Sequence, residues 1–288
     1  MMSEKKNLPK MTIGELARMK AEGRKISMIT AYDYPTARIA DRVGLDILLV
    51  GDSVGMTVLG YENTLPVTME EMLVFTKAVA RGAKRPFILG DMPYMSYQVS
   101  NEEAVRNAGR LIGEAGADGV KLEGGFTMLE RIKAIVAAGI PVMGHLGLTP
   151  QSLSMMGGFK VQGNTAAVAK RLYDEALALE DAGVFAILLE LIPAPVAEAI
   201  SRAVRVPTIS IGSGVDCDGQ CLIFHDLIGL FEAFVPRHVK QYGNVMQVVE
   251  GALSTYVDEV RSLAFPKAEN TFRIKDSELE EFKRAISS

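Results

Sequence analysis

The feature that most constrains this chain is a series of short apolar runs, each of which stops at an acidic or imidazole side chain. The runs end at five positions, which are Asp52, Asp91, Glu123, His145 and Glu190. Each run has the length of a β-strand and is followed by a stretch with helical periodicity. Because parallel strands that alternate with helices present their carboxyl ends at one face, these five side chains are predicted to converge.

Strand-like and helix-like segments alternate along most of the chain. Eight strands are predicted, at Ile26–Tyr32, Asp46–Val50, Pro86–Leu89, Gly119–Leu122, Val142–Gly144, Phe185–Leu189, Thr208–Ile211 and either Leu222–His225 or Ala233–Pro236. Helices are predicted at Thr12–Glu22, Tyr34–Val43, Met69–Arg81, Glu102–Ala115, Met128–Ala138, Thr165–Ala182 and Val196–Ala203. Eight repeats favour closure into a (β/α)8 barrel. An open doubly wound sheet is the alternative, but no G-x-G-x-x-G motif follows the first strand.

Length and composition are compatible with one such domain. The chain has 288 residues, of which 48% are hydrophobic, and this is enough to bury a large core. We expect a barrel with an N-terminal helix over residues 1–265 and a tail over residues 266–288. In the tail, Asp276–Ile286 has the pattern of a short amphipathic helix, which is predicted to dock on the barrel or on a neighbouring subunit. Three pairs have the spacing of helix caps: Thr68 with Glu71, Ser100 with Glu103, and Ser277 with Glu280.

Charge and hydropathy exclude some classes of partner. The net charge is −4 and no long basic run is present, so nucleic acid and anionic membranes are poor partners. The N-terminal segment lacks the apolar core of a secretory signal, and the longest apolar stretch, about Val184–Ile192, is too short to span a bilayer. We therefore expect a cytoplasmic protein. Cys217, Cys221 and His225 have a spacing that suggests zinc, but without a partner motif ordinary buried thiols are favoured.

Three of the strand-end carboxylates predict a site for a divalent cation. Asp52, Asp91 and Glu123 end the second, third and fourth predicted strands, which are neighbours in a barrel of sequential strand order. Like charges repel one another in a confined site unless a cation, a shared proton or a lysine offsets them. Three oxygen ligands suit Mg²⁺, which usually keeps water or substrate oxygens in its other positions. The alternative for each residue alone is a cap on the helix that follows.

Lys121 and Glu190 are the candidates for substrate binding and for acid–base catalysis. Lys121 lies two residues before Glu123, so both side chains point into the barrel. Lys121 is predicted either to bind a substrate carboxylate or carbonyl oxygen, or to neutralise Glu123. Glu190 stands among aliphatic residues, a setting that raises a carboxyl pKa towards the range of a general base. The alternative is a structural ion pair with Arg202 or Arg205.

Three further features are weaker signals. His145 is a candidate for a hydrogen bond to a substrate oxygen, although a lone histidine is more often structural. The connection 146–164 is long, and loops of this length in compact domains are usually functional or disordered. The turn Gly212–Gly214 has the composition of the phosphate-binding turn found in many barrels.

Seven spaced motifs together resemble one family. They are GDSVGM from Gly51, NTLPVTMEEM from Asn63, DMPYMSY from Asp91, VKLEGG from Val120, GHLGLTPQS from Gly144, GGFKVQG from Gly157 and SGVDCDGQ from Ser213. In this order they resemble the ketopantoate hydroxymethyltransferase family. The resemblance implies a (β/α)8 TIM barrel of the phosphoenolpyruvate/pyruvate superfamily type. It also implies transfer of a hydroxymethyl group from 5,10-methylenetetrahydrofolate to 3-methyl-2-oxobutanoate, which gives ketopantoate for the synthesis of pantothenate and coenzyme A.

The resemblance implies roles for individual residues. The metal, Mg²⁺ or another divalent cation, is expected between Asp52, Asp91 and Glu123, and Glu190 is expected to accept the proton. From the residue patterns and the resemblance together, we expect five residues to contact the oxoacid: Asp52, Ser53, Asp91, Lys121 and His145. Members often assemble as homodecamers, so a homo-oligomer is expected and a decamer is favoured.

Two other functions stay open on sequence grounds. Another metal-dependent 2-oxoacid aldolase or lyase of the same superfamily would use the same carboxylates, but such relatives often place a cysteine in the active loop. A catalytically silent barrel that serves binding or assembly is the second alternative. Lys121, Glu123 and Glu190 argue against it, because charged side chains cost stability when they are buried.

Overall fold

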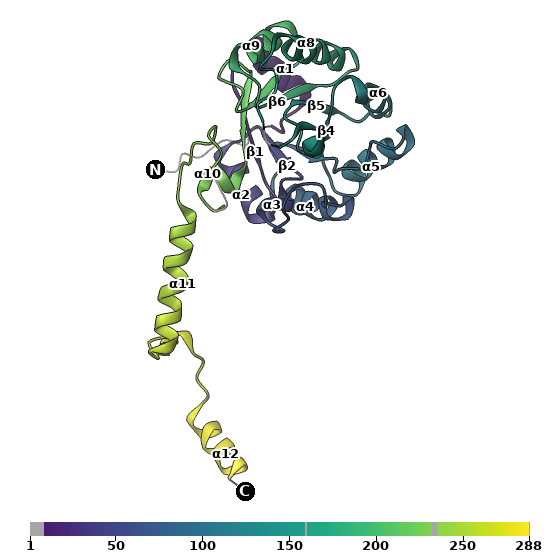
Figure 1. Cartoon of the computed structure of the whole chain (residues 1–288). Coiled ribbons are helices and arrows are strands. Elements are labelled where there is room, and N and C mark those ends of the chain that lie inside the picture. Colours follow the sequence, from purple (N-terminus) through teal and green to yellow (C-terminus); the bar gives the residue numbers. More distant parts are fainter. Residues whose placement is uncertain (1–8, 159, 232–234, 288) are drawn as a thin grey trace. The chain divides into compact units, whose positions relative to one another are not determined.

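The computed structural model describes residues 9–158, 160–231 and 235–287 (Figure 1). Within these ranges eight parallel strands pair in sequence order, and β1 also pairs with β8, so that the sheet closes into a barrel. The strands are β1 Ile26–Thr30, β2 Ile47–Val50, β3 Phe87–Asp91, β4 Gly119–Glu123, β5 Val142–Gly147, β6 Ala186–Glu190, β7 Thr208–Ile211 and β8 Gly219–Leu222. The predicted (β/α)8 barrel is confirmed, and the open sheet is excluded.

Helices precede, connect and follow the strands (Figure 1). They are α1 Ile13–Ala21, α2 Tyr34–Val43, α3 Val54–Thr57, α4 Met69–Gly82, α5 Asn101–Gly113, α6 Leu129–Ala137, α7 Leu153–Met156, α8 Ala166–Asp181, α9 Ala194–Ala203 and α10 Phe224–Ile228. Each of the seven helices predicted in this part of the chain is present within two residues at either end. Short helices α3, α7 and α10 were not predicted, and all three lie in connections that follow a strand.

Side chains alternate across the barrel wall and divide the core into two clusters. On β2, Ile47 and Leu49 belong to the inner cluster, whereas Leu48 and Val50 belong to the outer cluster between sheet and helices. The inner cluster continues into α1 through Leu16 and Met19. Helix α1 therefore closes the amino-terminal end of the barrel, and the carboxyl ends of the strands remain available for a site.

Two predictions about strand position are corrected. His145 lies inside β5, which runs three residues further than predicted, rather than after the strand. The eighth strand, Gly219–Leu222, lies before the predicted Leu222–His225, and the other predicted position, Ala233–Pro236, falls partly outside the described residues. The segment GQCL has no apolar run of its own, and its strand conformation comes from pairing with β1 and β7.

The helix caps follow the predicted signals at two of three places. At α4, the Thr68 hydroxyl accepts from the Glu71 amide at 3.2 Å, and the Glu71 carboxylate accepts from the Thr68 amide at 2.7 Å, which is a full capping box. At α5, the Ser100 hydroxyl accepts from the Glu103 amide at 3.1 Å. The predicted cap at Ser277 is wrong, because that helix begins at Asp276 and Ser277 already lies in its first turn.

The chain divides into two compact units, and the second consists of residues 228–230 and the segment from Gln241 onward. It contains α11 (Val245–Arg261), a 3-10 turn at Ala268–Asn270 and α12 (Asp276–Ile286). The division comes earlier than the expected boundary at residue 265, and α11 was not predicted. The predicted tail helix is confirmed as α12. No helix among the described residues combines the length and apolar character needed to cross a bilayer.

Candidate active site

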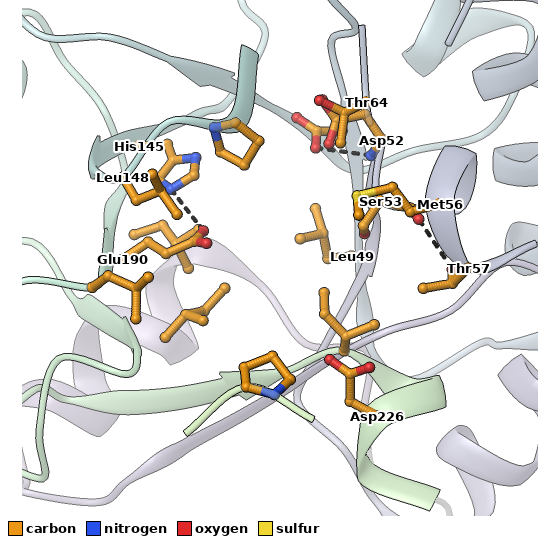
Figure 2. A pocket seen from close by; sticks show the side chains of 18 of the residues that line it. Leu49, Asp52, Ser53, Met56, Thr57, Thr64, His145, Leu148, Glu190 and Asp226 are labelled. Atoms are coloured by element: carbon orange, nitrogen blue, oxygen red, sulfur yellow. Dashed lines mark hydrogen bonds and ion pairs between the residues drawn. The ribbon is translucent and has the colours of Figure 1, made fainter. Parts of the chain in front are cut away.

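A cavity of about 370 Å³ opens at the carboxyl ends of the barrel strands. Every site residue that the sequence predicted lines this cavity: Asp52, Ser53, Asp91, Lys121, Glu123, His145 and Glu190. They lie on β3 to β6 or in the turn directly after β2. Figure 2 shows His145 and Glu190 on one side of the cavity and Asp52 and Ser53 on another. The prediction that the strand ends converge is therefore met by all five runs.

Strand register places the charged side chains next to one another. Asp91 pairs with Lys121 between β3 and β4, and Glu123 pairs with His145 between β4 and β5. Gly147 pairs with Glu190 between β5 and β6. A Cβ atom at Gly147, where φ is +95°, would lie 2.1 Å from the carbonyl oxygen of Glu190. Only glycine therefore allows β5 to pass this closely beside Glu190.

The carboxylates of Asp52, Asp91 and Glu123 are buried, with at most 4% of each residue exposed. Burial raises the pKa of Asp52 well above its usual range, and repulsion by Asp91 adds to this effect. Burial also raises the pKa of Asp91, although Lys121 opposes the shift. The helix after β3 is capped by Ser100 and the 3-10 turn after β4 has Gly125 at its N-cap, so the helix-cap alternative does not hold for Asp91 and Glu123. The three carboxylates concentrate negative charge in a small volume.

Lys121 is the cation closest to this cluster. Its Nζ lies 2.8 Å from Asp91 Oδ1 and 4.0 Å from Glu123 Oε1, so it neutralises mainly Asp91 rather than Glu123. Burial alone would lower the pKa of Lys121, but attraction by Asp91, Glu123 and Asp52 outweighs burial and raises the pKa. Lys121 is therefore a permanent positive charge at the cavity wall.

His145 links Glu190 to the carboxylate cluster. Its Nε2 lies 3.2 Å from Glu190 Oε2, and its Nδ1 lies 3.5 Å from Glu123 Oε1 (Figure 2). Burial and the nearby Lys121 would lower the pKa of His145, but hydrogen bonds with Glu123 and Glu190 raise it to about 9. The imidazole is thus held in its charged form with one carboxylate on each side.

The arginine pairs proposed as an alternative for Glu190 do not form. Arg202 pairs with Glu198 at 2.6 Å, and Arg205 pairs with Glu180 at 3.4 Å. The Glu190 side chain is 16% exposed, which makes it the most accessible carboxylate of the predicted set. It faces the cavity with one oxygen held by His145 and the other available to a ligand.

Ser53 is prepared to donate a hydrogen bond into the cavity. Its hydroxyl oxygen lies 2.8 Å from the hydroxyl of Tyr32. Burial raises the pKa of Tyr32 to about 12, so the phenol keeps its proton and can donate it to Ser53. When Tyr32 donates, the hydrogen of the Ser53 hydroxyl is free to meet an acceptor such as a substrate carboxylate.

A buried glutamine that the residue patterns did not single out holds two of the carboxylates. Gln151, at the start of the long connection after β5, donates from Nε2 to Asp52 Oδ2 at 2.9 Å. Its backbone amide donates to Glu123 Oε2 at 2.9 Å. Its Oε1 accepts from the hydroxyl of Tyr97 at 2.7 Å, and that hydroxyl also accepts from the Glu123 amide at 3.1 Å. Gln151 and Tyr97 form a polar strut between the long connection and the carboxylates.

Replacing Gln151 with leucine is expected to lower the free energy of unfolding by about 3 kcal/mol, because it removes the donor to the buried Asp52 carboxylate and the acceptor of the Tyr97 hydroxyl. Urea titrations with a chelator present would measure the loss. Gln220→Leu is the matched control, since Gln220 is exposed and donates only to the carbonyl of Gly214. A loss no larger than that of the control would show that the strut does not stabilise the fold.

The cavity carboxylates are the type of ligand that Mg²⁺ binds, although they do not form a preorganised metal site. Across the described part of the chain, no three His, Cys, Asp or Glu side chains have the arrangement of a preformed metal cluster. Mg²⁺, however, commonly binds through one or two carboxylates and completes its shell with water and substrate oxygens. Glu123 Oε1 is buried and has ion-pair contacts with His145 and Lys121, but it accepts no hydrogen bond from the described residues. An oxygen-rich set of donors with a free acceptor suits a hard divalent cation.

The two cysteines and the turn after β7 have structural roles. The thiols of Cys217 and Cys221 are free and buried, and burial raises the pKa of Cys217 to about 11. His225 contacts aromatic rings instead, with centroid distances of 5.5 Å to Tyr32 and 5.6 Å to Phe224. Ser213 is the central residue of the turn Gly212–Gly214, and its hydroxyl donates to the Leu189 carbonyl at 2.8 Å. This hydrogen bond fixes the turn to the end of β6.

Comparison with known proteins identifies relatives along almost the whole chain. A protein of Moorella thermoacetica named 3-methyl-2-oxobutanoate hydroxymethyltransferase is 54% identical over 264 residues, which cover 92% of this chain and 98% of that protein. A protein of Acetivibrio thermocellus with the same name is 52% identical over 267 residues, which cover 93% of this chain and 94% of that protein.

Similar solved structures are far more distant in sequence. Phosphonopyruvate hydrolase has a TM-score of 0.60 and 13% identity, with 96% of this chain and 97% of that chain covered. 2,3-Dimethylmalate lyase, a member of the PEP mutase/isocitrate lyase superfamily, has a TM-score of 0.55 and 15% identity, with 95% of this chain and 98% of that chain covered. These similarities concern the fold alone, and they agree with the closed eight-stranded barrel seen here.

The family itself is established by sequence. The sequence model described as ketopantoate hydroxymethyltransferase matches residues 10–268, which include the whole barrel and α11. Relatives above 50% identity over more than nine tenths of the chain agree with this match. The chain belongs to the ketopantoate hydroxymethyltransferase family.

Proposed function

We propose that this protein transfers a hydroxymethyl group from 5,10-methylenetetrahydrofolate to 3-methyl-2-oxobutanoate and so forms 2-dehydropantoate. The observation that carries the proposal is the position of Glu190, which faces a cavity shared with Asp52, Asp91 and Glu123. A base and a cation-binding cluster in one cavity suit removal of a proton next to a carbonyl group. Family membership supplies the identity of the two substrates.

A divalent cation, Mg²⁺ in the first instance, would be held by Asp52, Asp91 and Glu123. Bound there, it supplies a Lewis acid that withdraws electrons from the 2-oxo group and makes the hydrogen on C3 of the oxoacid acidic. The site supports this proposal because one lysine faces three buried carboxylates. A cation would relieve the repulsion that raises the pKa of Asp52.

The protein's own groups account for the other requirements of the reaction. Glu190 takes the C3 proton on the oxygen that His145 does not hold, and the charged imidazole fixes the orientation of this carboxylate. Lys121 stabilises negative charge that develops on the oxygen atoms of the oxoacid. Ser53 donates its hydroxyl hydrogen to the carboxylate of the oxoacid.

The overall reaction is balanced by one water molecule. A carbon–carbon bond forms between C3 and the one-carbon unit, and the C3 proton leaves to Glu190. Water supplies the hydroxyl of the new hydroxymethyl group, and its second proton together with the C3 proton completes the two N–H groups of the released tetrahydrofolate. No redox partner is needed, because C3 supplies the electron pair of the new carbon–carbon bond, so the fall in oxidation state of the one-carbon unit is matched by a rise at C3.

A superfamily lyase that uses a cysteine as acid is disfavoured by the cavity lining. Neither Cys217 nor Cys221 is among the residues that line the cavity. Burial also raises the pKa of both thiols, which makes them poor proton donors.

The same proposal includes assembly as a homo-oligomer. Helix α11 presents apolar side chains at helical spacing, and Val249, Leu253, Tyr256 and Val260 are all at least 40% exposed. Such a face on a helix normally meets a partner. A second copy of the chain is the partner that family resemblance favours, with the tail helix α12 as a further contact.

Proton NMR of 3-methyl-2-oxobutanoate in deuterated buffer tests the function directly. With protein, Mg²⁺ and methylenetetrahydrofolate, 2-dehydropantoate is expected to form, and with a chelator in place of Mg²⁺ it is not. Loss of the C3 proton signal without product would support the proton-transfer step and reject methylenetetrahydrofolate as the one-carbon donor. Product at an equal rate with the chelator would reject the metal site.

A further inference from the structure

The half of the cavity that faces β7, β8 and β1 has a different character from the half that holds the cluster. Its lining combines apolar residues, Ile211, Ile223, Phe231 and Pro236, with the polar side chains of Arg237 and His238. Asp226, on the short helix α10 after β8, is the carboxylate of this half. Figure 2 shows Asp226 at the lower edge of the cavity with its carboxylate directed inward, whereas Asp52 and Glu190 lie on other sides.

Asp226 is buried without a protein partner. Only 7% of the residue is exposed, and throughout residues 9–158, 160–231 and 235–287 no hydrogen bond or ion pair satisfies its carboxylate. Burial, with no compensating donor, raises the pKa of Asp226 to about 6. Other buried carboxylates of this chain behave differently: Asp46 pairs with Arg85 at 3.1 Å, and Glu175 pairs with Arg171 at 3.1 Å.

An unpaired buried carboxylate costs stability, so its retention at a cavity wall calls for a ligand that supplies donors. The oxoacid does not meet this need, because it carries acceptor oxygens and a negative charge that Asp226 would repel. The one-carbon donor does meet it. The pterin ring of a reduced folate presents its 2-amino group and the neighbouring N3–H side by side, and these two donors match the two oxygens of one carboxylate.

We propose that Asp226 binds the folate co-substrate by accepting hydrogen bonds from the 2-amino group and N3–H of its pterin ring, with the ring packed against the apolar wall. The inference rests on the proposed function and assigns a binding residue to the second substrate. Ile211, Ile223 and Pro236 provide apolar contacts for an aromatic heterocycle. The benzoylglutamate end of the folate, which carries carboxylates, then points away from Asp226 towards the opening of the cavity.

This placement uses the part of the rim that the oxoacid leaves free. The oxoacid lies over β2 to β4, where Asp52, Asp91 and Lys121 are found, and Glu190 reaches it from β6. A donor bound between β7 and β1 approaches the same central space from the remaining side. Two substrates can therefore occupy the cavity together, as bond formation between them requires.

The test compares Asp226→Asn with wild type, using tetrahydrofolate as the probe in isothermal titration calorimetry with Mg²⁺ present. An asparagine offers one acceptor oxygen and turns an N–H group towards the ring. The dissociation constant for tetrahydrofolate is therefore expected to rise by about tenfold or more. Asp216→Asn is the matched control, because Asp216 is exposed and does not line the cavity. Its dissociation constant is expected to match that of wild type.

A second probe makes the assignment specific to the pterin edge. A tetrahydrofolate analogue that lacks the 2-amino group is expected to bind wild type at least several-fold more weakly than tetrahydrofolate, roughly the value of one charge-assisted hydrogen bond. Asp226→Asn is expected to show little further discrimination between the two compounds. Equal discrimination by wild type and variant would overturn the proposal.

Stability separates a binding role from a structural one. If Asp226 only supported the fold, Asp226→Asn would unfold at a lower temperature than wild type. Because the carboxylate is unpaired, the variant is expected to unfold at the same or a higher temperature. Its C3 proton exchange, which does not involve the folate, is expected to continue, and this shows that the oxoacid half is intact.

The outcomes distinguish this inference from the proposed function. If wild type forms 2-dehydropantoate and Asp226→Asn binds tetrahydrofolate within about twofold of wild type, the inference fails and the function stands. If wild type exchanges the C3 proton but does not bind tetrahydrofolate, the folate part of the function fails and the inference fails with it.

Discussion

Glu190→Gln is expected to lower the rate of C3 proton exchange in 3-methyl-2-oxobutanoate by about a thousandfold, which is within the usual contribution of a general base. The amide keeps the shape of the side chain and its contact with His145, but it cannot accept the proton. Binding of the oxoacid and of Mg²⁺ is expected to change little, since neither depends on this carboxylate. Deuterium exchange followed by proton NMR gives the rate, and calorimetry gives the two affinities.

The matched control is Glu198→Gln. Glu198 lies on α9 and pairs with the exposed Arg202, so its loss is expected to leave exchange unchanged. Exchange in Glu190→Gln at the rate of the control would remove Glu190 from the role of base. Loss of oxoacid binding together with exchange would instead assign Glu190 to substrate binding.

Lys121→Met is expected to lower the free energy of unfolding by about 3 to 5 kcal/mol near pH 8 in the absence of divalent cations. Methionine fills a similar volume, so the loss reports on charge. Lys121 lowers the pKa of both Asp52 and Asp91, and without it the buried carboxylates have no adjacent lysine. Urea titrations of the variant and wild type would measure the difference.

The effect of Lys121→Met is expected to shrink in acid. Burial already raises the pKa of Asp52 and Asp91 above the values of an unfolded chain, so their contribution to stability is greatest at low pH and falls as the pH rises through the raised values. Removing Lys121 moves both pKa values further up. Near pH 5 more of the carboxyl groups are protonated in the folded variant, and its deficit relative to wild type should be smaller than near pH 8.

Lys170→Met provides the comparison for this prediction. Lys170 pairs with Asp174 at 2.7 Å on the surface of α8, and exposed pairs of this kind contribute about 0 to 1 kcal/mol. A deficit in Lys121→Met that is the same at both pH values would contradict the prediction. It would indicate lost packing rather than an uncompensated charge.

Much of the fold could be predicted because local patterns and tertiary structure agree. Strands β2 to β6 carry apolar runs that are buried on both faces, and helices α2 and α4 carry both a cap and an apolar face. Strand β8 could not be predicted in the same way, since Gln220 is exposed and the segment is short. Helix α11 was missed because its many valines and Gly251 lower helix propensity, although its apolar residues have helical spacing.

The same distinction between local pattern and tertiary packing applies to the residues of the site. Asp52, Asp91, Glu123 and Glu190 stand at strand ends, where the barrel fixes position, and a sequence pattern is enough to place them together. Asp226 lines the cavity, and Gln151 and Tyr97 hold its carboxylates, from segments that follow the strands and whose paths depend on packing that no local pattern records. Gln151 does lie within the motif GHLGLTPQS, but nothing in the motif indicates that its amide returns to Asp52.

The pairing of β1 with β8 has a consequence for the synthesis of this protein. Met28 lies beside Cys221 in the closed barrel, so the first strand to leave the ribosome keeps an open edge until the last strand has emerged. Nascent chains therefore carry an apolar strand edge for most of translation, which exposes them to chaperones and to pairing with other chains. Premature termination just before Gly219 would leave a fragment that contains six of the seven sequence motifs in full but cannot close the barrel.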